Sequence, residues 1–131
     1  MKSLSSALIF SDNFITSTTL SNQLRKLGIN KIYECKSSKN ALSILINSKL
    51  DFVFVDSDSK EYDSSKVIQQ LDTFTDAEII ILGLEENKSK TLDYFFSSNC
   101  ELNFLSKPIS YDDVEQIIVK ENTYHFFGEI A

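Results

Sequence analysis

Two aspartates stand at the ends of apolar segments, where their carboxylates could do chemistry. Asp56 closes the apolar run 52–55, which holds two Phe and two Val, and Asp58 follows it in a polar stretch. Asp12 comes soon after the apolar run 7–10. A short apolar run bounded by acids is typical of a strand buried on both faces. Open α/β sheets bind their ligands at the carboxyl ends of such strands, so Asp56 is the first candidate functional residue.

Five apolar segments alternate with five amphipathic ones along the chain. We expect strands at 7–10, 31–35, 51–55, 78–82 and 101–105, and helices at 14–27, from Ser37 or Ser38 to Ile46, and at 64–71, 88–97 and 111–120. Strict alternation of strand and helix predicts a parallel sheet covered on both faces. With right-handed crossovers, the fold class is α/β, a five-stranded, flavodoxin-like, doubly wound (βα)5 sheet in the order 2-1-3-4-5. This order places the first and third strands side by side, so that Asp12 and Asp56 meet.

Composition and charge narrow the classes of function. The chain has 131 residues, enough for one domain with a core, and a formal net charge of −6. An acidic chain without a basic stripe is not expected to bind nucleic acid, and it favours a metal cation or a basic partner. No apolar run approaches the length of a membrane span, and the N-terminus lacks the pattern of a signal peptide. Cys35 and Cys100 have no metal-type spacing, so we expect packed, reduced thiols in a cytoplasmic protein.

Three short motifs stand at the ends of three different expected strands. Ser11-Asp12-Asn13 follows the first strand, Asp56 closes the third, and Lys107-Pro108 follows the fifth. Together, and in this order, they resemble the receiver domain (CheY-like) of bacterial two-component response regulators, in an atypical form. The resemblance covers nearly the whole chain. It implies a receiver domain over 1–121 and a C-terminal tail or helix extension over 122–131.

The resemblance also implies a role for each matching residue. Asp56 would accept a phosphoryl group from a histidine kinase or a phosphotransfer protein, with Mg²⁺ as the cofactor. The metal ligands would be Asp12, Asp56 and the backbone carbonyl of Asp58. Lys107 would pair with the acyl phosphate, and Pro108 would shape the turn through a cis peptide bond. The chemistry is consistent, because Mg²⁺ prefers oxygen ligands and a carboxylate attacks a phosphoryl group only where cations offset the charge.

Several positions depart from the pattern of the family. Receivers usually carry two acids after the first strand, and here the first is Ser11, which should weaken metal binding rather than abolish it. The fourth strand usually ends in a Thr or Ser whose hydroxyl binds the phosphoryl group, and here Gly83 takes that place, followed by a bulky Leu84. Backbone groups of Gly83 or Leu84 would then meet the phosphate. Phe104 matches the aromatic residue whose rotation reports activation. The pocket thus lacks the hydroxyl of the usual switch.

Two functions other than phosphoryl acceptance stay open at this point. A degenerate receiver would act as a phosphorylation-independent interaction or dimerisation module, through the face of the fourth helix, fifth strand and fifth helix, or through the C-terminal tail. A pocket closed by Leu84 over Asp56 would favour this alternative. A small phosphatase is disfavoured, because it needs a downstream acidic pair at a strand end, and Asp112-Asp113 begins a helix. We therefore expect no enzymatic activity beyond phosphorylation of the chain itself.

Overall fold

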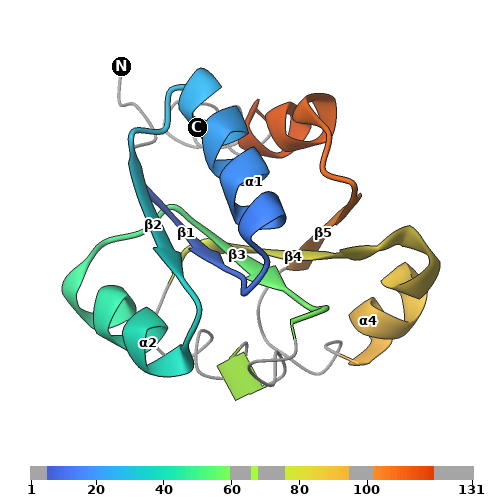
Figure 1. The fold of residues 1–131 in the computed structure, drawn as a ribbon, viewed down its shortest axis with the longest axis horizontal. Coiled ribbons are helices and arrows are strands. Elements are labelled where there is room, and N and C mark those ends of the chain that lie inside the picture. The colour runs from blue at the N-terminus through green and yellow to red at the C-terminus, as the bar shows by residue number, and fades with distance from the viewer. Residues whose placement is uncertain (1–5, 60–65, 68–75, 95–101, 120–131) are drawn as a thin grey trace, which may run out of the picture.

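Figure 1 shows the fold of the chain, a computed structural model that describes residues 6–59, 66–67, 76–94 and 102–119. The elements are β1 (Ser6–Phe10), α1 (Phe14–Lys26), β2 (Lys31–Cys35), α2 (Ser38–Asn47), β3 (Phe52–Asp56), β4 (Glu78–Leu84), the short 3₁₀ helix η1 (Glu85–Asn87), α4 (Lys88–Tyr94) and β5 (Leu102–Lys107). A further helix covers residues 111–119, and residues 66–67 are also helical. Strands and helices alternate as the apolar pattern of the sequence predicts.

The strands form one parallel sheet of five in the order β2-β1-β3-β4-β5. This confirms the predicted flavodoxin-like order. The central pair is β1 and β3, in which Phe10 lies opposite Val55. On the other side of β3, Asp56 lies opposite Leu82 of β4. The carboxyl ends of β1, β3 and β4 therefore lie next to one another at one edge of the sheet.

Helices cover both faces of the sheet, and each face has its own apolar cluster. In Figure 1, α1 and the helix over 111–119 lie on one side of the sheet, and α2 and α4 lie on the other. Leu20 and Leu24 of α1 pack with Val114 on alternate strand residues such as Phe54. Leu45 of α2 packs on the opposite set of strand residues. Because β3 is covered on both faces, all five of its residues are buried, including the aspartate at its end.

Local signals in the sequence set the ends of α1 and α2. The side chain of Asn13 caps α1 by accepting a hydrogen bond from the backbone N–H of Thr16, at 3.0 Å. Ser37 caps α2 in the same way, at 3.3 Å from the nitrogen of Asn40, as the sequence indicates. Gly28 follows α1 with a φ of 93°, a left-handed conformation that favours glycine. These caps fix where the chain leaves β1 and re-enters the sheet.

The ends of the last two strands differ from the prediction. β4 continues to Leu84 rather than stopping at Leu82, because Gly83 and Leu84 pair with Ser106 and Lys107 of β5. For the same reason β5 reaches Lys107, although the sequence predicts a strand that ends at Leu105. Gly83 therefore lies in the sheet, paired with Ser106 of β5, while the pairing of β4 with β3 ends one residue earlier, at Leu82. Because Gly83 has no side chain, it leaves room for neighbouring groups and offers no hydroxyl at this position.

Some predictions lie outside the described residues. These are most of the helix over 64–71, the end of the helix over 88–97, Cys100 and the tail over 122–131. The other thiol is buried, and burial raises the pKa of Cys35 to about 12, which agrees with a packed and unreactive cysteine. Among the described helices, none is both long enough and apolar enough to cross a membrane.

Candidate functional site

The candidate site is the carboxyl edge of the sheet, where three strands bring polar side chains together. Asp56 ends β3, Ser11 follows β1, and Lys107 ends β5. Asp56 is only 1% exposed, and the side chain of Lys107 is 16% exposed. A buried carboxylate is costly unless it is paired and hydrogen-bonded, so its partners decide what it can do.

Both carboxylate oxygens of Asp56 have close partners. Oδ2 accepts a hydrogen bond from the hydroxyl of Ser11 at 2.7 Å. Oδ1 lies 2.7 Å from the ammonium of Lys107 and accepts a bond from the backbone N–H of Asp58 at 3.0 Å. The same ammonium lies 3.2 Å from Oδ2 of Asp58. One cation thus bridges two acids, and the buried charge of Asp56 is compensated by three donors from three parts of the chain.

Ser11 contacts Asp56 directly, which the sequence did not predict. In the sequence this position stood out only because receivers usually carry an acid there. Its hydroxyl donates to Asp56 and accepts a bond from the backbone N–H of Asn13 at 3.1 Å. Its own N–H donates to the carbonyl of Cys35 at the end of β2, also at 3.1 Å. These bonds hold a neutral donor against one oxygen of Asp56, at the position where receivers usually carry an acid.

The turn after β5 presents Lys107 at the site. The Lys107-Pro108 peptide bond is cis, as expected from the resemblance. The side chain of Gln23 in α1 donates to the carbonyl of Ile109 at 3.1 Å, which ties this turn to the first helix. Between the two segments lies an open cleft of about 240 Å³, lined by Asn13, Ile15, Thr16, Thr19, Lys107, Pro108 and Ile109. Lys107 therefore reaches from the wall of a surface cleft to the buried carboxylate.

The β4 side of the site is packed rather than charged. Ser57 follows Asp56 and donates two hydrogen bonds to the carbonyl of Leu82, from its N–H at 2.9 Å and from its hydroxyl at 2.8 Å. A Cβ atom on Gly83 would lie 2.6 Å from the hydroxyl oxygen of Ser57 and 3.2 Å from the ring of Phe104. The space that a hydroxyl-bearing side chain at position 83 would need is therefore already filled.

Phe104 and its surroundings form the outer part of this side. The ring is partly buried and packs against the core cluster on the α2 face, and the ammonium of Lys88 lies 6.0 Å from the ring centre. Ser106, on β5, donates a hydrogen bond to the carboxylate of Glu85 in η1. Leu84 is 39% exposed. The donors to the carboxylate of Asp56 named above, on Ser11, Lys107 and Asp58, lie in other parts of the site.

The acids and carbonyls at this edge suit a magnesium ion in their chemistry. Asp12 is half-buried in the turn after β1, and the carboxylate of Asp56 and the carbonyl of Asp58 belong to the neighbouring strand end. Among the described residues, no group of three or more His, Cys, Asp or Glu side chains is arranged to hold a metal. Magnesium keeps several waters and commonly uses only one or two carboxylates, so two acids and a carbonyl fit a weakly held ion.

Comparisons with solved structures agree with this fold. A response regulator from Colwellia psychrerythraea has a TM-score of 0.74 at 16% identity, covering 93% of this chain and 99% of that one. A CheY-like receiver domain from Methylobacillus flagellatus has a TM-score of 0.72 at 22% identity, over 90% and 98% of the two chains. The receiver domain of a modulated diguanylate cyclase from Desulfovibrio desulfuricans has a TM-score of 0.74 at 21% identity, over 93% and 99%.

Comparisons of sequence found no match. No family model matches the chain, and no curated protein matches it either. The structural neighbours are mostly response-regulator receiver domains and match this chain over nearly its full length. The chain has the fold of response-regulator receiver domains.

Proposed function

We propose that this chain is a two-component signalling receiver that accepts a phosphoryl group on Asp56. The observation that carries the proposal is the carboxylate of Asp56, buried at the carboxyl edge of the sheet and 2.7 Å from the ammonium of Lys107. An oxygen of this carboxylate would form a bond to phosphorus. The bond from phosphorus to the donor's imidazole nitrogen would break, and the nitrogen would keep the electron pair. Lys107 would follow the charge from the carboxylate to the phosphoryl oxygens.

Magnesium would offset the rest of the charge at this site. Asp12, the carboxylate of Asp56 and the carbonyl of Asp58 are the residues that would hold it. The ion would supply positive charge between the carboxylate and the incoming phosphoryl group, which otherwise repel each other. Lys107 alone faces at least two acids here, since it lies within 3.2 Å of both Asp56 and Asp58.

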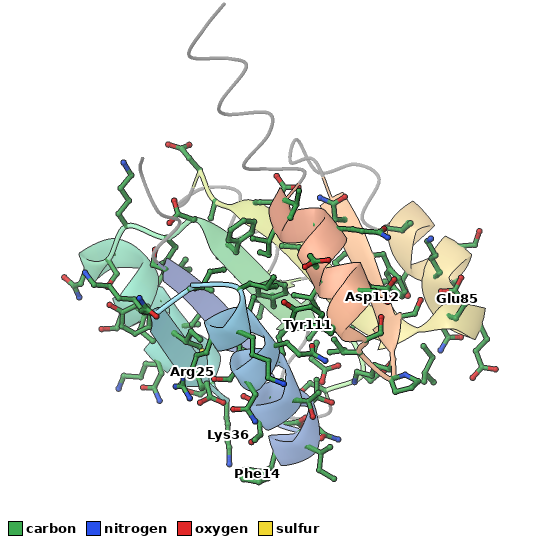
Figure 2. All side chains as sticks on the ribbon, turned by 90° about the horizontal axis from the view of Figure 1, so that it is seen from above. Phe14, Arg25, Lys36, Glu85, Tyr111 and Asp112 are labelled. Carbon is green, nitrogen blue, oxygen red and sulfur yellow. The ribbon has the colours of Figure 1, made fainter. Side chains whose placement is uncertain are left out.

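A protein donor, a histidine kinase or a phosphotransfer protein of the cytoplasm, fits the surface beside the site. Phe14 and Ile15 are 74% and 76% exposed at the start of α1. Figure 2 shows Phe14 pointing outward from the end of this helix. Ile15 also lines the cleft into which Lys107 opens. Exposed apolar side chains next to a reactive group are typical of a surface that a partner covers during transfer.

The second candidate is a degenerate receiver that acts as an interaction or dimerisation module. One observation favours it: Asp56 is 1% exposed, and each of its oxygens is already held by a donor. A phosphoryl group reaches this carboxylate only if Ser11 or Lys107 gives way. In this case the pairing surface would be the face of α4, β5 and the helix over 111–119, or the tail over 122–131.

Intact mass after incubation with acetyl phosphate and Mg²⁺ separates the two candidates. We expect one phosphoryl adduct on the parent chain, none on Asp56→Ala, and one on the control Asp112→Asn, which changes an exposed acid at the start of the last helix. An adduct that persists in Asp56→Ala places the acceptor elsewhere. No adduct on a folded parent contradicts the proposal and favours the degenerate module.

A further inference from the structure

Ser57 makes an unusual pair of hydrogen bonds directly after the acceptor candidate. Its backbone N–H and its hydroxyl both donate to the carbonyl of Leu82, at 2.9 and 2.8 Å. One donor suffices to satisfy a buried carbonyl. The hydroxyl can therefore turn away about the Cα–Cβ bond while the N–H keeps the carbonyl of Leu82 bonded. Ser57 thus carries a donor at the strand end that can be released at low cost.

Gly83 lacks a side chain because of space and not because of its backbone. Among the described glycines, only Gly28 has a positive φ, so the backbone conformation of Gly83 does not itself require glycine. A Cβ at this position would meet the hydroxyl oxygen of Ser57 at 2.6 Å and the ring of Phe104 at 3.2 and 3.3 Å. The first distance is shorter than real contacts of this kind allow. The hydroxyl of Ser57 therefore occupies the place that a side chain on β4 would take.

A phosphoryl group would bring more negative charge into a pocket that has few cations. The donors to Asp56 include the hydroxyl of Ser11, the ammonium of Lys107 and the backbone N–H of Asp58. Two of them belong to β1 and β5 or the turns that follow. Ser57, the residue after Asp56, holds its hydroxyl against the carbonyl of Leu82, the residue of β4 that lies opposite Asp56. A hydroxyl is a suitable donor here, because it adds no charge of its own and can rotate to suit its acceptor.

We propose that the Ser57 hydroxyl is the donor that the β4 side of the pocket presents to a phosphoryl group on Asp56, with Gly83 leaving it room. This inference rests on the proposed function and assigns a residue to it. As the carboxylate oxygen bonds to phosphorus, the hydroxyl leaves the carbonyl of Leu82 and donates to a phosphoryl oxygen. The hydroxyl proton stays on Ser57 throughout, and no bond to the serine oxygen forms or breaks.

The test moves the hydroxyl from one strand to the other. Three variants are compared with the parent: Ser57→Ala, Ser57→Ala with Gly83→Ala, and Ser57→Ala with Gly83→Ser. The readout is the initial rate of adduct formation, measured by intact mass with acetyl phosphate and Mg²⁺. We expect Ser57→Ala to be slower by about tenfold or more, since one preorganised donor to developing charge is worth about 10²–10³ in oxyanion holes. Only the double variant with Gly83→Ser should recover most of the rate.

The two double variants separate chemistry from packing. Both fill the space that Ser57→Ala opens next to the ring of Phe104, but only one restores a hydroxyl. Equal recovery in both would show that packing alone matters and would overturn the inference. Ser43→Ala, at an exposed serine of α2, is the control for a serine loss as such. Thermal melts of each variant show that the compared chains are folded.

Failure of the inference and failure of the proposed function give different results. If the parent forms no adduct, the proposed function is wrong and the role of Ser57 falls with it. If the parent forms the adduct and Ser57→Ala forms it at the same rate, only the role of Ser57 is wrong. If Ser57→Ala is slow and the hydroxyl at position 83 restores the rate, the inference holds.

Discussion

The two sides of the Asp56 pocket are built on different physical principles. On the β1 and β5 side, Ser11 and Lys107 each lie 2.7 Å from an oxygen of the carboxylate. On the β4 side, Ser57 bonds to the backbone, Gly83 has no side chain, and the ring of Phe104 fills the remaining space. The first side is held by charged contacts to the carboxylate, and the second by uncharged hydrogen bonds to the backbone and by close packing.

The two sides of the pocket bear on different steps, namely the acceptance of a phosphoryl group and the transmission of that event to the protein surface. The β1 and β5 side keeps a carboxylate and a cation in contact, which is what phosphoryl transfer requires of the acceptor. The β4 side cannot relay the event through a hydroxyl at position 83 to an aromatic ring, because no such hydroxyl is present and the ring already occupies the space. A change of surface on phosphorylation would therefore start from groups other than a side chain at position 83, such as Ser57 or Lys107. The predictions that follow test this division, beginning with the largest expected effect.

Removing the cation should break the charged side. In Lys107→Met the buried carboxylate of Asp56 loses its ion pair, and we expect the free energy of unfolding to fall by about 3 kcal/mol, near the cost of breaking a buried pair. Urea denaturation at neutral pH measures this loss. The control Lys90→Met removes an exposed lysine of α4 and should change stability by about 0.5 kcal/mol or less.

A double variant shows whether the loss comes from the unpaired charge. Asp56→Asn combined with Lys107→Met removes both charges and keeps the shape of the side chains. The double variant should be more stable than Lys107→Met alone, because no buried charge is left without a cation. If it is no more stable, the lysine acts through packing of its methylene groups and the charged description of this side is wrong.

Adding one methyl group at Gly83 should disturb the packing on the β4 side of the pocket and destabilise the fold. Gly83→Ala places a Cβ 2.6 Å from the Ser57 hydroxyl and 3.2 Å from the ring of Phe104. We expect a loss of about 2 kcal/mol, because the hydroxyl must give up its hydrogen bond to Leu82 and the ring must shift. In a Ser57→Ala background the clash with the hydroxyl is gone, so the same substitution should cost about 1 kcal/mol less. Urea denaturation of the four chains gives this coupling. Additive losses would show that Phe104, and not Ser57, resists the methyl group.

The sequence was a good guide to the fold because the fold depends on patterns repeated along the chain. The run 52–55 is short and apolar at every position, as expected of a strand covered on both faces, and β3 is buried in this way. Caps such as Ser37 are equally local, since the side chain bonds to a backbone group three residues away. Strand ends were less predictable, because Gly83 and Leu84 join β4 through pairing with residues of β5 far along the chain.

The candidate site was only partly predictable, for a physical reason. Strand order alone places Asp56 and Lys107 near one edge, and the structure brings them into contact. A neutral hydroxyl such as that of Ser11 or Ser57 gives no signal of this kind in a serine-rich chain, because serine is common in every turn. What distinguishes these two serines is which acceptor lies within reach, a property of the folded chain. The signal that could have pointed to Ser57 is the glycine at position 83, whose missing side chain needs a spatial partner.

The smallest expected effect concerns the affinity of the site for Mg²⁺. Ser11→Asp restores a second acid beside Asp56, where the serine hydroxyl now donates. Affinity for calcium-type and magnesium-type ions grows with the number of charged ligands, so we expect about tenfold tighter Mg²⁺ binding, equal to ~1.4 kcal/mol. Without metal the same variant should be less stable than the parent, because two neighbouring carboxylates repel each other and one hydrogen-bond donor is lost.

The opposite change tests whether the ion binds at this edge at all. Asp12→Ala should abolish the Mg²⁺ affinity that calorimetric titration detects on the parent, while Asp112→Asn, at an exposed acid of the last helix, should leave it unchanged. Asp12 is the acid in the turn after β1, where the preceding residue is Ser11 rather than a second acid. Unchanged affinity in Asp12→Ala would put the metal elsewhere. The charge of Asp56 would then be offset by protein donors such as Lys107, Ser11 and the backbone N–H of Asp58, which makes the acceptor dependent on these groups during transfer.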